Sequence, residues 1–319
     1  MANRAEVRMA TAEDAPAMVE VIHAAFGARP PLDPPSTADN ETAESVVAAM
    51  VACGAVLAEV DGRVAGVVLL AESAPQVIGM RRVSVHPDFQ RHGIGTALVA
   101  AAEEFAAGTG HRSIELGARP ELPELISYWQ RRGYRIVDDG ADPLITLGRA
   151  LPAAVWADSA EAMRALGAAL AAMLQPGDLI VASGQLGAGK TTFTQGIGAG
   201  LGAQGQIISP TFVLSRVHPT PDGRPDLVHV DAYRLSGLDE LEDLDLDASL
   251  AEAVTVVEWG RGVAEGMLDH RLEVDILRSD DSDESRLVLL QGFGSRWDGV
   301  DLWSLVDAIG GVSEAEGAV

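Results

Sequence analysis

The pattern with the clearest chemistry is Gly184–Thr191, which reads GQLGAGKT and lies between an apolar segment and a helix-like one. It has the spacing of a P-loop, whose glycines let backbone N–H groups face phosphate oxygens while a lysine reaches the terminal phosphates. Lys190 is the only lysine among the 23 Lys and Arg residues, which indicates that this position needs a compact ammonium. We expect the nucleotide to contact Gly184, Gln185, Leu186, Gly187, Ala188, Gly189, Lys190, Thr191 and Thr192. It should be ATP, because the guanine-reading motif N-K-x-D needs a further lysine.

Two acidic residues close apolar segments further along the chain. Asp231 ends LVHVD and Glu258 ends VTVVE, so both carboxylates should lie at the C-terminal ends of parallel strands, where α/β sheets bind ligands. Together with the Thr191 hydroxyl they offer the hard oxygen atoms that Mg²⁺ prefers. We therefore predict Thr191, Asp231 and Glu258 as metal ligands. Lys190, Asp231 and Glu258 are the predicted catalytic residues, with Glu258 orienting the attacking water.

The order of motifs in the second half resembles one family. GQLGAGKTTFTQGIGAGLG is followed by SPTF (209–212), HVDAYRL (229–235) and VEWG (257–260), as in the TsaE (YjeE) family. The resemblance covers about residues 153–306 and implies an ATPase in the synthesis of threonylcarbamoyladenosine in tRNA, working with a threonylcarbamoyl transferase and its paralogue (TsaD/TsaB-like). It also implies that Ser209 and Thr211 belong to a switch-like loop and that Trp259 lines the ATP site. Gln185 replaces the acidic residue usual in the family.

A second glycine pattern, Gln90–Thr96 (QRHGIGT), follows a strand-like segment that ends at Val85. Its glycines would let the backbone approach a pyrophosphate at the positive end of the next helix. With YWQRRGYRI at 128–136, this pattern resembles the GNAT acetyltransferases over about residues 5–149. The resemblance implies acetyl-CoA contacts at Val83, Val85, Gln90, Arg91, His92, Gly93, Ile94, Gly95 and Thr96.

Two features usual in GNAT enzymes are missing from this half. No Asp or Glu lies between Glu72 and Asp88, where the family often has its general base. Trp129 stands where the family commonly has a tyrosine, and Tyr128 is shifted by one residue, about 100° around a helix. Acetyl transfer would then need an amine that arrives deprotonated or a base acting through water. The alternative is a non-catalytic acetyl-CoA sensor.

The surrounding pattern predicts an α/β protein of two domains. Residues 1–150 should form a GNAT-like mixed α/β sheet, with strands at 5–9 and 56–70, the latter around an Asp61-Gly62 turn. Residues 151–308 alternate strand and helix, which favours the α/β layered sheet of a P-loop NTPase. We expect residues 309–319 to be disordered, and the acidic run 238–253 to be a solvated helical face or a partner surface.

Composition limits the partners. The net charge is −24, with 13 Arg against 20 acidic residues up to position 150 and 10 basic against 27 acidic residues beyond it. Such a surface repels phosphates, so any contact with tRNA should be indirect, through a partner. The sequence has one cysteine and no apolar run of membrane-spanning length, and we expect a cytoplasmic location. A small-molecule kinase and an acetyltransferase gated by ATP remain alternative functions.

Overall fold

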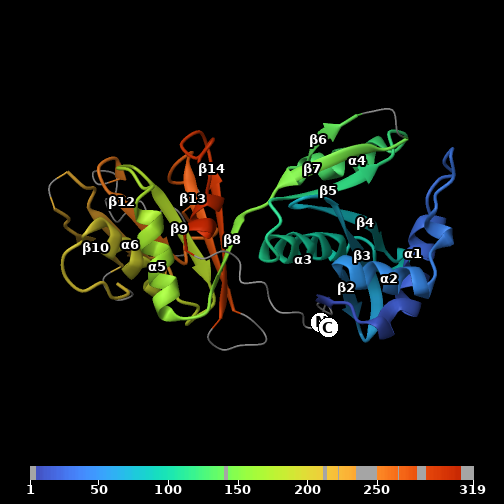
Figure 1. Ribbon diagram of the computed structural model, residues 1–319, viewed down its shortest axis with the longest axis horizontal. Coiled ribbons are helices and arrows are strands. Elements are labelled where there is room, and N and C mark those ends of the chain that lie inside the picture. Colours follow the sequence, from blue (N-terminus) through green and yellow to red (C-terminus); the bar gives the residue numbers. More distant parts are fainter. Residues whose placement is uncertain are drawn as a thin grey trace. The chain divides into compact units, whose positions relative to one another are not determined.

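The computed structural model describes residues 5–139, 143–210, 214–221, 223–234, 250–264, 266–278 and 285–309. The chain divides into two compact units, Met1–Leu151 and Pro152–Val319, and each contains a seven-stranded sheet (Figure 1). The predicted α/β class with two mixed sheets is confirmed. The predicted disordered tail from 310 onward and the acidic run up to residue 249 lie outside the described residues.

The sheet of the first unit has the strand order β1-β2-β3-β4-β5-β7-β6, and its neighbours are antiparallel except for β4 and β5. Its strands are β1 (Glu6–Met9), β2 (Ala55–Val60), β3 (Arg63–Ala74), β4 (Val77–Val85), β5 (Ser113–Ala118), β6 (Arg135–Asp138) and β7 (Ile145–Ala150). The helices are α1 (Ala15–Gly27), α2 (Ala43–Cys53), α3 (Ile94–Gly108) and α4 (Pro123–Arg131).

Alternation along β2 and β3 fixes which helices cover which face. Asp61 and Gly62 join the two strands with φ of 53° and 72°, the left-handed pair of a tight hairpin. Alternate apolar residues such as Leu57 and Val67 pack against α1 and α2. The opposite face meets α3 closely, because a Cβ at Gly66 would lie 2.7 Å from Leu98 Cδ1. The sheet is therefore covered on both sides.

The parallel pair β4 and β5 separates along its length. Val77–Met80 pairs with Ser113–Leu116, and no pairing between the two strands extends beyond these residues. A bulge lies at the same point, where the register with β3 shifts and Arg82 has φ of 50°. The ends of β4 and β5 therefore leave an opening in the sheet.

The sheet of the second unit has the order β10-β11-β12-β9-β13-β14-β8, with β11, β12, β9 and β13 parallel at its centre. Its strands are β8 (Ala153–Ala157), β9 (Leu179–Gly184), β10 (Ser215–His218), β11 (Leu227–Asp231), β12 (Val254–Glu258), β13 (Arg271–Arg278) and β14 (Arg286–Phe293). Its described helices are α5 (Ala160–Ala171), α6 (Lys190–Leu201) and α9 (Trp303–Ala308).

Helices α5 and α6 cross at very short range. A Cβ at Gly167 would lie 2.3 Å from Phe193 O, and one at Gly196 would lie 2.2 Å from Arg164 O, so glycine is needed at both positions. The pair packs on one face of the sheet and fixes the start of α6 over the ends of the central strands. Across the described ranges, no helix combines the length and hydrophobicity needed to cross a bilayer.

Candidate functional site

The glycine-rich loop of the second unit joins β9 to α6. Gly184 ends the strand with φ of 149°, and Gly189 precedes the helix with φ of 111°. A Cβ at Gly184 would lie 2.5 Å from Ile276 O on the neighbouring strand β13. The loop is thus packed against the sheet in a backbone conformation that only glycine adopts readily. Within this loop, the Leu186 side chain at the tip is largely exposed.

Lys190 lies at the mouth of this loop. The residue is 5% exposed, and Nζ donates to the carbonyl oxygens of Gly184 at 2.8 Å and Gln185 at 3.0 Å. Its ammonium also lies 3.7 Å from the centre of the Trp259 ring. Burial lowers the pKa of Lys190, while the nearby Glu258 and Asp231 carboxylates oppose that shift. The ammonium is therefore desolvated and directed at the loop.

The two predicted carboxylates end adjacent parallel strands. Asp231 closes β11 and Glu258 closes β12, and the two residues are paired in register. Thr191 Oγ1 donates to Glu258 Oε2 at 3.1 Å, and Ser209 Oγ donates to Asp231 Oδ2 at 2.7 Å. Four residues distant in sequence thus meet at the C-terminal edge of the sheet.

This donor set fits Mg²⁺. It consists of hydroxyl and carboxylate oxygens, and Mg²⁺ is usually held by one or two carboxylates together with substrate phosphates and water. No cluster of three or more His, Cys, Asp or Glu side chains suited to a metal occurs in the described part of the chain. A cation here would therefore depend on the Thr191 hydroxyl and on the phosphates of a nucleotide.

His229 is a site residue that the sequence analysis did not assign. It is fully buried on β11, and its Nε2 lies 2.7 Å from Glu258 Oε1. Glu258 is therefore held between this imidazole and the Thr191 hydroxyl. The HVD sequence could have predicted this position. Residues two apart on a strand lie on the same face, so His229 and Asp231 share one side of the sheet.

Trp259, whose ring lies beside Lys190, contacts a second aromatic residue. Trp259 has φ of 62°, and its ring centre lies 5.1 Å from that of the exposed Tyr233. Tyr233 N also donates to Asp231 Oδ1 at 3.0 Å. The structure therefore places Trp259 beside Lys190 and Ser209 beside Asp231, whereas Thr211 lies outside the described residues.

In the first unit, the predicted acetyl-CoA loop follows β4 and ends at the start of α3. Gly93 precedes the helix with φ of 77°, and a Cβ built on it would meet nothing within 4 Å. Gln90 Nε2 donates weakly to Val85 O at 3.4 Å, and His92 Nδ1 lies 3.3 Å from Phe89 O. The start of a 15-residue helix is thus open, with backbone free to approach an anion, which suits a pyrophosphate.

A cavity of about 540 Å³ occupies the opening between β4 and β5. Among the predicted contacts, Val83, Val85 and Gly95 line it. Tyr128 lines it as well, and its Oη would lie 3.8 Å from a Cβ at Gly95, so the shifted tyrosine does reach this space. The buried Tyr134 instead donates to Glu103 Oε1 at 2.8 Å.

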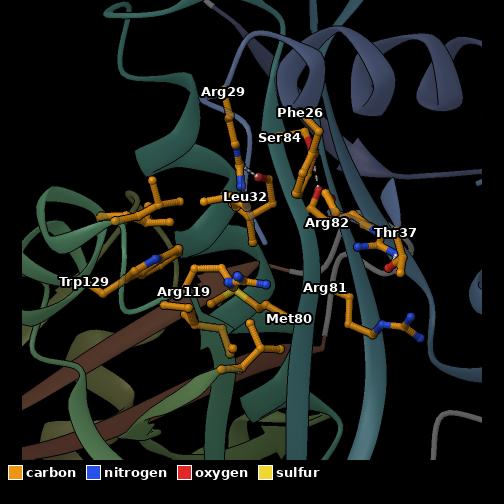
Figure 2. Close-up of a pocket in the computed structure, with 18 of the residues that line it drawn as sticks. Phe26, Arg29, Leu32, Thr37, Met80, Arg81, Arg82, Ser84, Arg119 and Trp129 are labelled. Carbon is orange, nitrogen blue, oxygen red and sulfur yellow. Dashed lines mark hydrogen bonds between the residues drawn. The ribbon is translucent and has the colours of Figure 1, made fainter. Parts of the chain in front are cut away.

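The same cavity is lined by four arginines that the sequence analysis did not group. They come from the end of α1, from β4 and from the segment after β5 (Figure 2), and they are Arg29, Arg81, Arg82 and Arg119. None of the described residues that line the cavity is acidic. Within the described part of the wall, the missing carboxylate on β4 is therefore not replaced by one from another element.

Comparisons with known proteins agree with the family resemblance of each half. The family model described as "Threonylcarbamoyl adenosine biosynthesis protein TsaE" matches residues 157–288, and that of "Acetyltransferase (GNAT) family" matches residues 19–134.

The relatives of the second half include two that carry the name "tRNA threonylcarbamoyladenosine biosynthesis protein TsaE". That of Streptomyces coelicolor is 56% identical over 143 residues, which cover 44% of this chain and 97% of that protein. That of Mycobacterium leprae is 45% identical over 137 residues, which cover 41% of this chain and 85% of that protein.

Among solved structures, a PaiA N-acetyltransferase from Thermoplasma acidophilum in complex with coenzyme A is 17% identical to this chain. The match covers 46% of this chain and 99% of that chain, with a TM-score of 0.41. The first half of this chain matches the family model of the GNAT acetyltransferases, and through its second half the chain belongs to the TsaE family.

Proposed function

We propose that the second half of this chain binds and hydrolyses ATP with Mg²⁺ as the ATPase subunit of tRNA threonylcarbamoyladenosine synthesis. The observation that carries the proposal is the meeting of Lys190, Thr191, Asp231 and Glu258 at one sheet edge. The pathway proposed is the one named for the relatives of the second half. Its partners would be a threonylcarbamoyl transferase and its paralogue, with tRNA reached through them, and its location would be cytoplasmic.

Each residue has a role that its contacts support. Lys190 would bind the terminal phosphates, because its desolvated ammonium faces the loop. Thr191 and Asp231 would hold Mg²⁺, which neutralises charge that develops on the phosphates. Glu258 would orient the attacking water, and the bond from His229 keeps its carboxylate in one orientation.

The first half, we propose, binds acetyl-CoA at Gln90–Thr96 and transfers the acetyl group to an amine. The open N-terminus of α3 and the cavity beside Gly95 and Tyr128 support this function. No described residue of the cavity wall is acidic, so the acceptor amine must lose its proton without a carboxylate from that part of the wall.

The test of the ATPase proposal is ATP hydrolysis by the purified chain, alone and with the cognate transferase pair, with tRNA analysed by mass spectrometry. We expect the pair to change ATP turnover and modified adenosine to form. Hydrolysis that ignores the partners, with no modified adenosine, would contradict the pathway. A small-molecule kinase or an ATP-gated acetyltransferase would then explain the P-loop better.

A further inference from the structure

The arginine-lined cavity of the first unit has a charge opposite to that of the chain. The whole sequence has a net charge of −24, yet the described residues of the cavity wall include four arginines and no acidic residue. Figure 2 shows the side chains of Arg29 and Arg119 extending into the space beside Trp129, while Arg81 points away from it. Such local reversal of sign concentrates anions in a cleft with low-dielectric walls.

Two of these arginines are already paired with carboxylates. Arg82 Nε donates to Glu41 Oε1 at 2.8 Å, and Arg119 Nη2 donates to Glu121 Oε1 at 2.8 Å. Arg119 also donates to main-chain carbonyl oxygens of Asp33 and Pro34, at 2.6 and 3.1 Å. These bonds hold both guanidinium groups in place at the cavity.

Arg29 differs from them. Its guanidinium carbon lies 3.8 Å from the centre of the Phe26 ring, and its recorded hydrogen bond is to Val83 O at 3.4 Å. Within the described ranges it makes no ion pair. Burial, with the neighbouring charge of Arg82, lowers the pKa of Arg29. A desolvated cation without a counter-charge is costly, so this position favours an anionic ligand.

We propose that the cavity binds the acceptor of acetyl transfer, and that this acceptor is a small primary amine carrying a carboxylate, bound by Arg29 with Arg82 and Arg119 beside it. The proposal rests on the proposed acetyltransferase function of the first half. The volume of about 540 Å³ lies within the range of roughly 300–1,000 Å³ usual for small-molecule sites, and the part beside Val83, Val85 and Gly95 is the one proposed for acetyl-CoA. An amino acid has the required chemistry, because the flat guanidinium matches a carboxylate through two parallel bonds.

The described wall of the cavity offers no carboxylate to accept a proton, so the amine must bind in its neutral form. Its nitrogen attacks the acetyl carbonyl carbon, a C–N bond forms and the C–S bond breaks. The proton lost by nitrogen ends on the sulfur, which leaves as the free thiol. The Tyr128 hydroxyl is on the cavity wall to assist that last transfer.

Direct binding tests the acceptor class without requiring turnover. Isothermal titration of the full chain, with and without coenzyme A, would compare alanine with alaninamide and glutamate with its diamide. We expect each acid to bind about tenfold or more tightly than its amide, as charge-assisted hydrogen bonds imply. Equal binding of acids and amides, or no binding of any acid, overturns the proposal. Tighter binding of peptides with acidic residues than of free amino acids would replace the small acceptor by a protein.

Substitutions of Arg29 test whether this residue causes the preference for acids over amides. Arg29→Gln should lower the affinity for the acids about tenfold or more and leave that for the amides unchanged, with Arg29→Lys intermediate. Arg135→Gln is the matched control, because Arg135 is exposed on β6 and lies outside the cavity wall. An unchanged preference in Arg29→Gln contradicts the role of Arg29. If acetyl-CoA does not bind and no amine is acetylated, the acetyltransferase proposal fails, while the comparison of acids with amides still decides the charge of the ligand.

Discussion

The two units contain comparable glycine loops that are built in different ways. Both join a strand to the start of a helix, β9 to α6 in the second unit and β4 to α3 in the first. Gly184 is packed against Ile276 of the next strand, whereas Gly93 has nothing within 4 Å of a built Cβ. The first of these loops is constrained by its sheet, and the second is a surface turn.

The charges at the two sites are also supplied differently. In the second unit the cation is Lys190, the first residue of α6, which donates to carbonyl oxygens of the loop, and the nearby carboxylates of Asp231 and Glu258 end adjacent strands. In the first unit the cations that face the cavity are arginines separated by up to 90 positions, Arg29 and Arg119. The comparison teaches that the residues of the proposed phosphate site come mostly from short motifs, while those of the proposed acceptor site are brought together only by the tertiary structure.

The largest expected effect is a loss of ATP turnover that leaves acetyl-CoA binding unchanged. Lys190→Ala should lower ATP turnover about 100-fold or more, as loss of a group that stabilises transition-state charge does. Acetyl-CoA binding by the first unit and the far-ultraviolet circular dichroism spectrum should stay unchanged. Arg164→Ala, on the exposed side of α5, is the control variant. ATP turnover at the wild-type rate in Lys190→Ala would refute the assignment of the P-loop.

A pair of glycine variants tests whether the loops differ in packing. Gly184→Ala should lower the free energy of unfolding by about 3 kcal/mol or more, because a Cβ there would lie 2.5 Å from Ile276 O in a backbone region that only glycine adopts readily. Gly93→Ala should cost only the left-handed strain, about 1–2 kcal/mol. Denaturant unfolding of both variants measures the difference. Equal losses would mean that the two loops are held alike.

The sequence predicts these loops, and most elements around them, better than it predicts the first site. Strand alternation and glycine positions locate β9, α6 and α3 because each depends on local pattern. The four-residue β10 has no such pattern, and it forms because β11 pairs with it. The site contact between His229 and Glu258 also depends on strand register. The arginine cavity could not be predicted, since it exists only where β4 and β5 separate.

A smaller effect concerns Trp259, whose ring lies against Lys190 in the proposed ATP site as the Phe26 ring lies against Arg29 in the first unit. Trp259→Ala should weaken ATP binding by about 0.5–2 kcal/mol, the usual strength of a cation–π contact, and Trp259→Phe should restore most of it. Equilibrium titration with ATP measures both. Full affinity in Trp259→Ala would show that the ring does not support Lys190 in the bound state.

The smallest effect is a difference in acid sensitivity. Burial lowers the pKa of His218 on β10 below its usual 6.5, so on acidification the unfolded state gains its proton first. The contribution of His218 to the stability of the second unit is therefore complete above pH 6.5 and is lost as the pH falls below it, by at most about 1.4 kcal/mol per pH unit. In the first unit, the hydrogen bond from Arg8 holds the pKa of Asp14 well below its usual range, so this contribution is lost only below about pH 3.8.

Hydrogen exchange followed by mass spectrometry would resolve this difference, because peptides report on each unit separately. Between pH 6.5 and 5, opening should increase in peptides of β10 and β11 after correction for intrinsic exchange. Peptides from β1 should change little over the same interval. The same change in both units, or its persistence in His218→Gln, would show that another group titrates.

The single lysine makes the P-loop addressable by chemical labelling. Reagents that acylate amines have one side-chain target in this sequence besides the N-terminal α-amino group, and burial lowers the pKa of the Lys190 amine, so more of it is unprotonated and nucleophilic at a given pH than for an exposed lysine. The extent of labelling at Lys190, read from the peptide that contains it, would therefore report how much of the loop is accessible at that moment. A molecule that covers the ammonium would leave this peptide unlabelled, and the fraction protected could be followed in mixtures too complex for an ATPase assay.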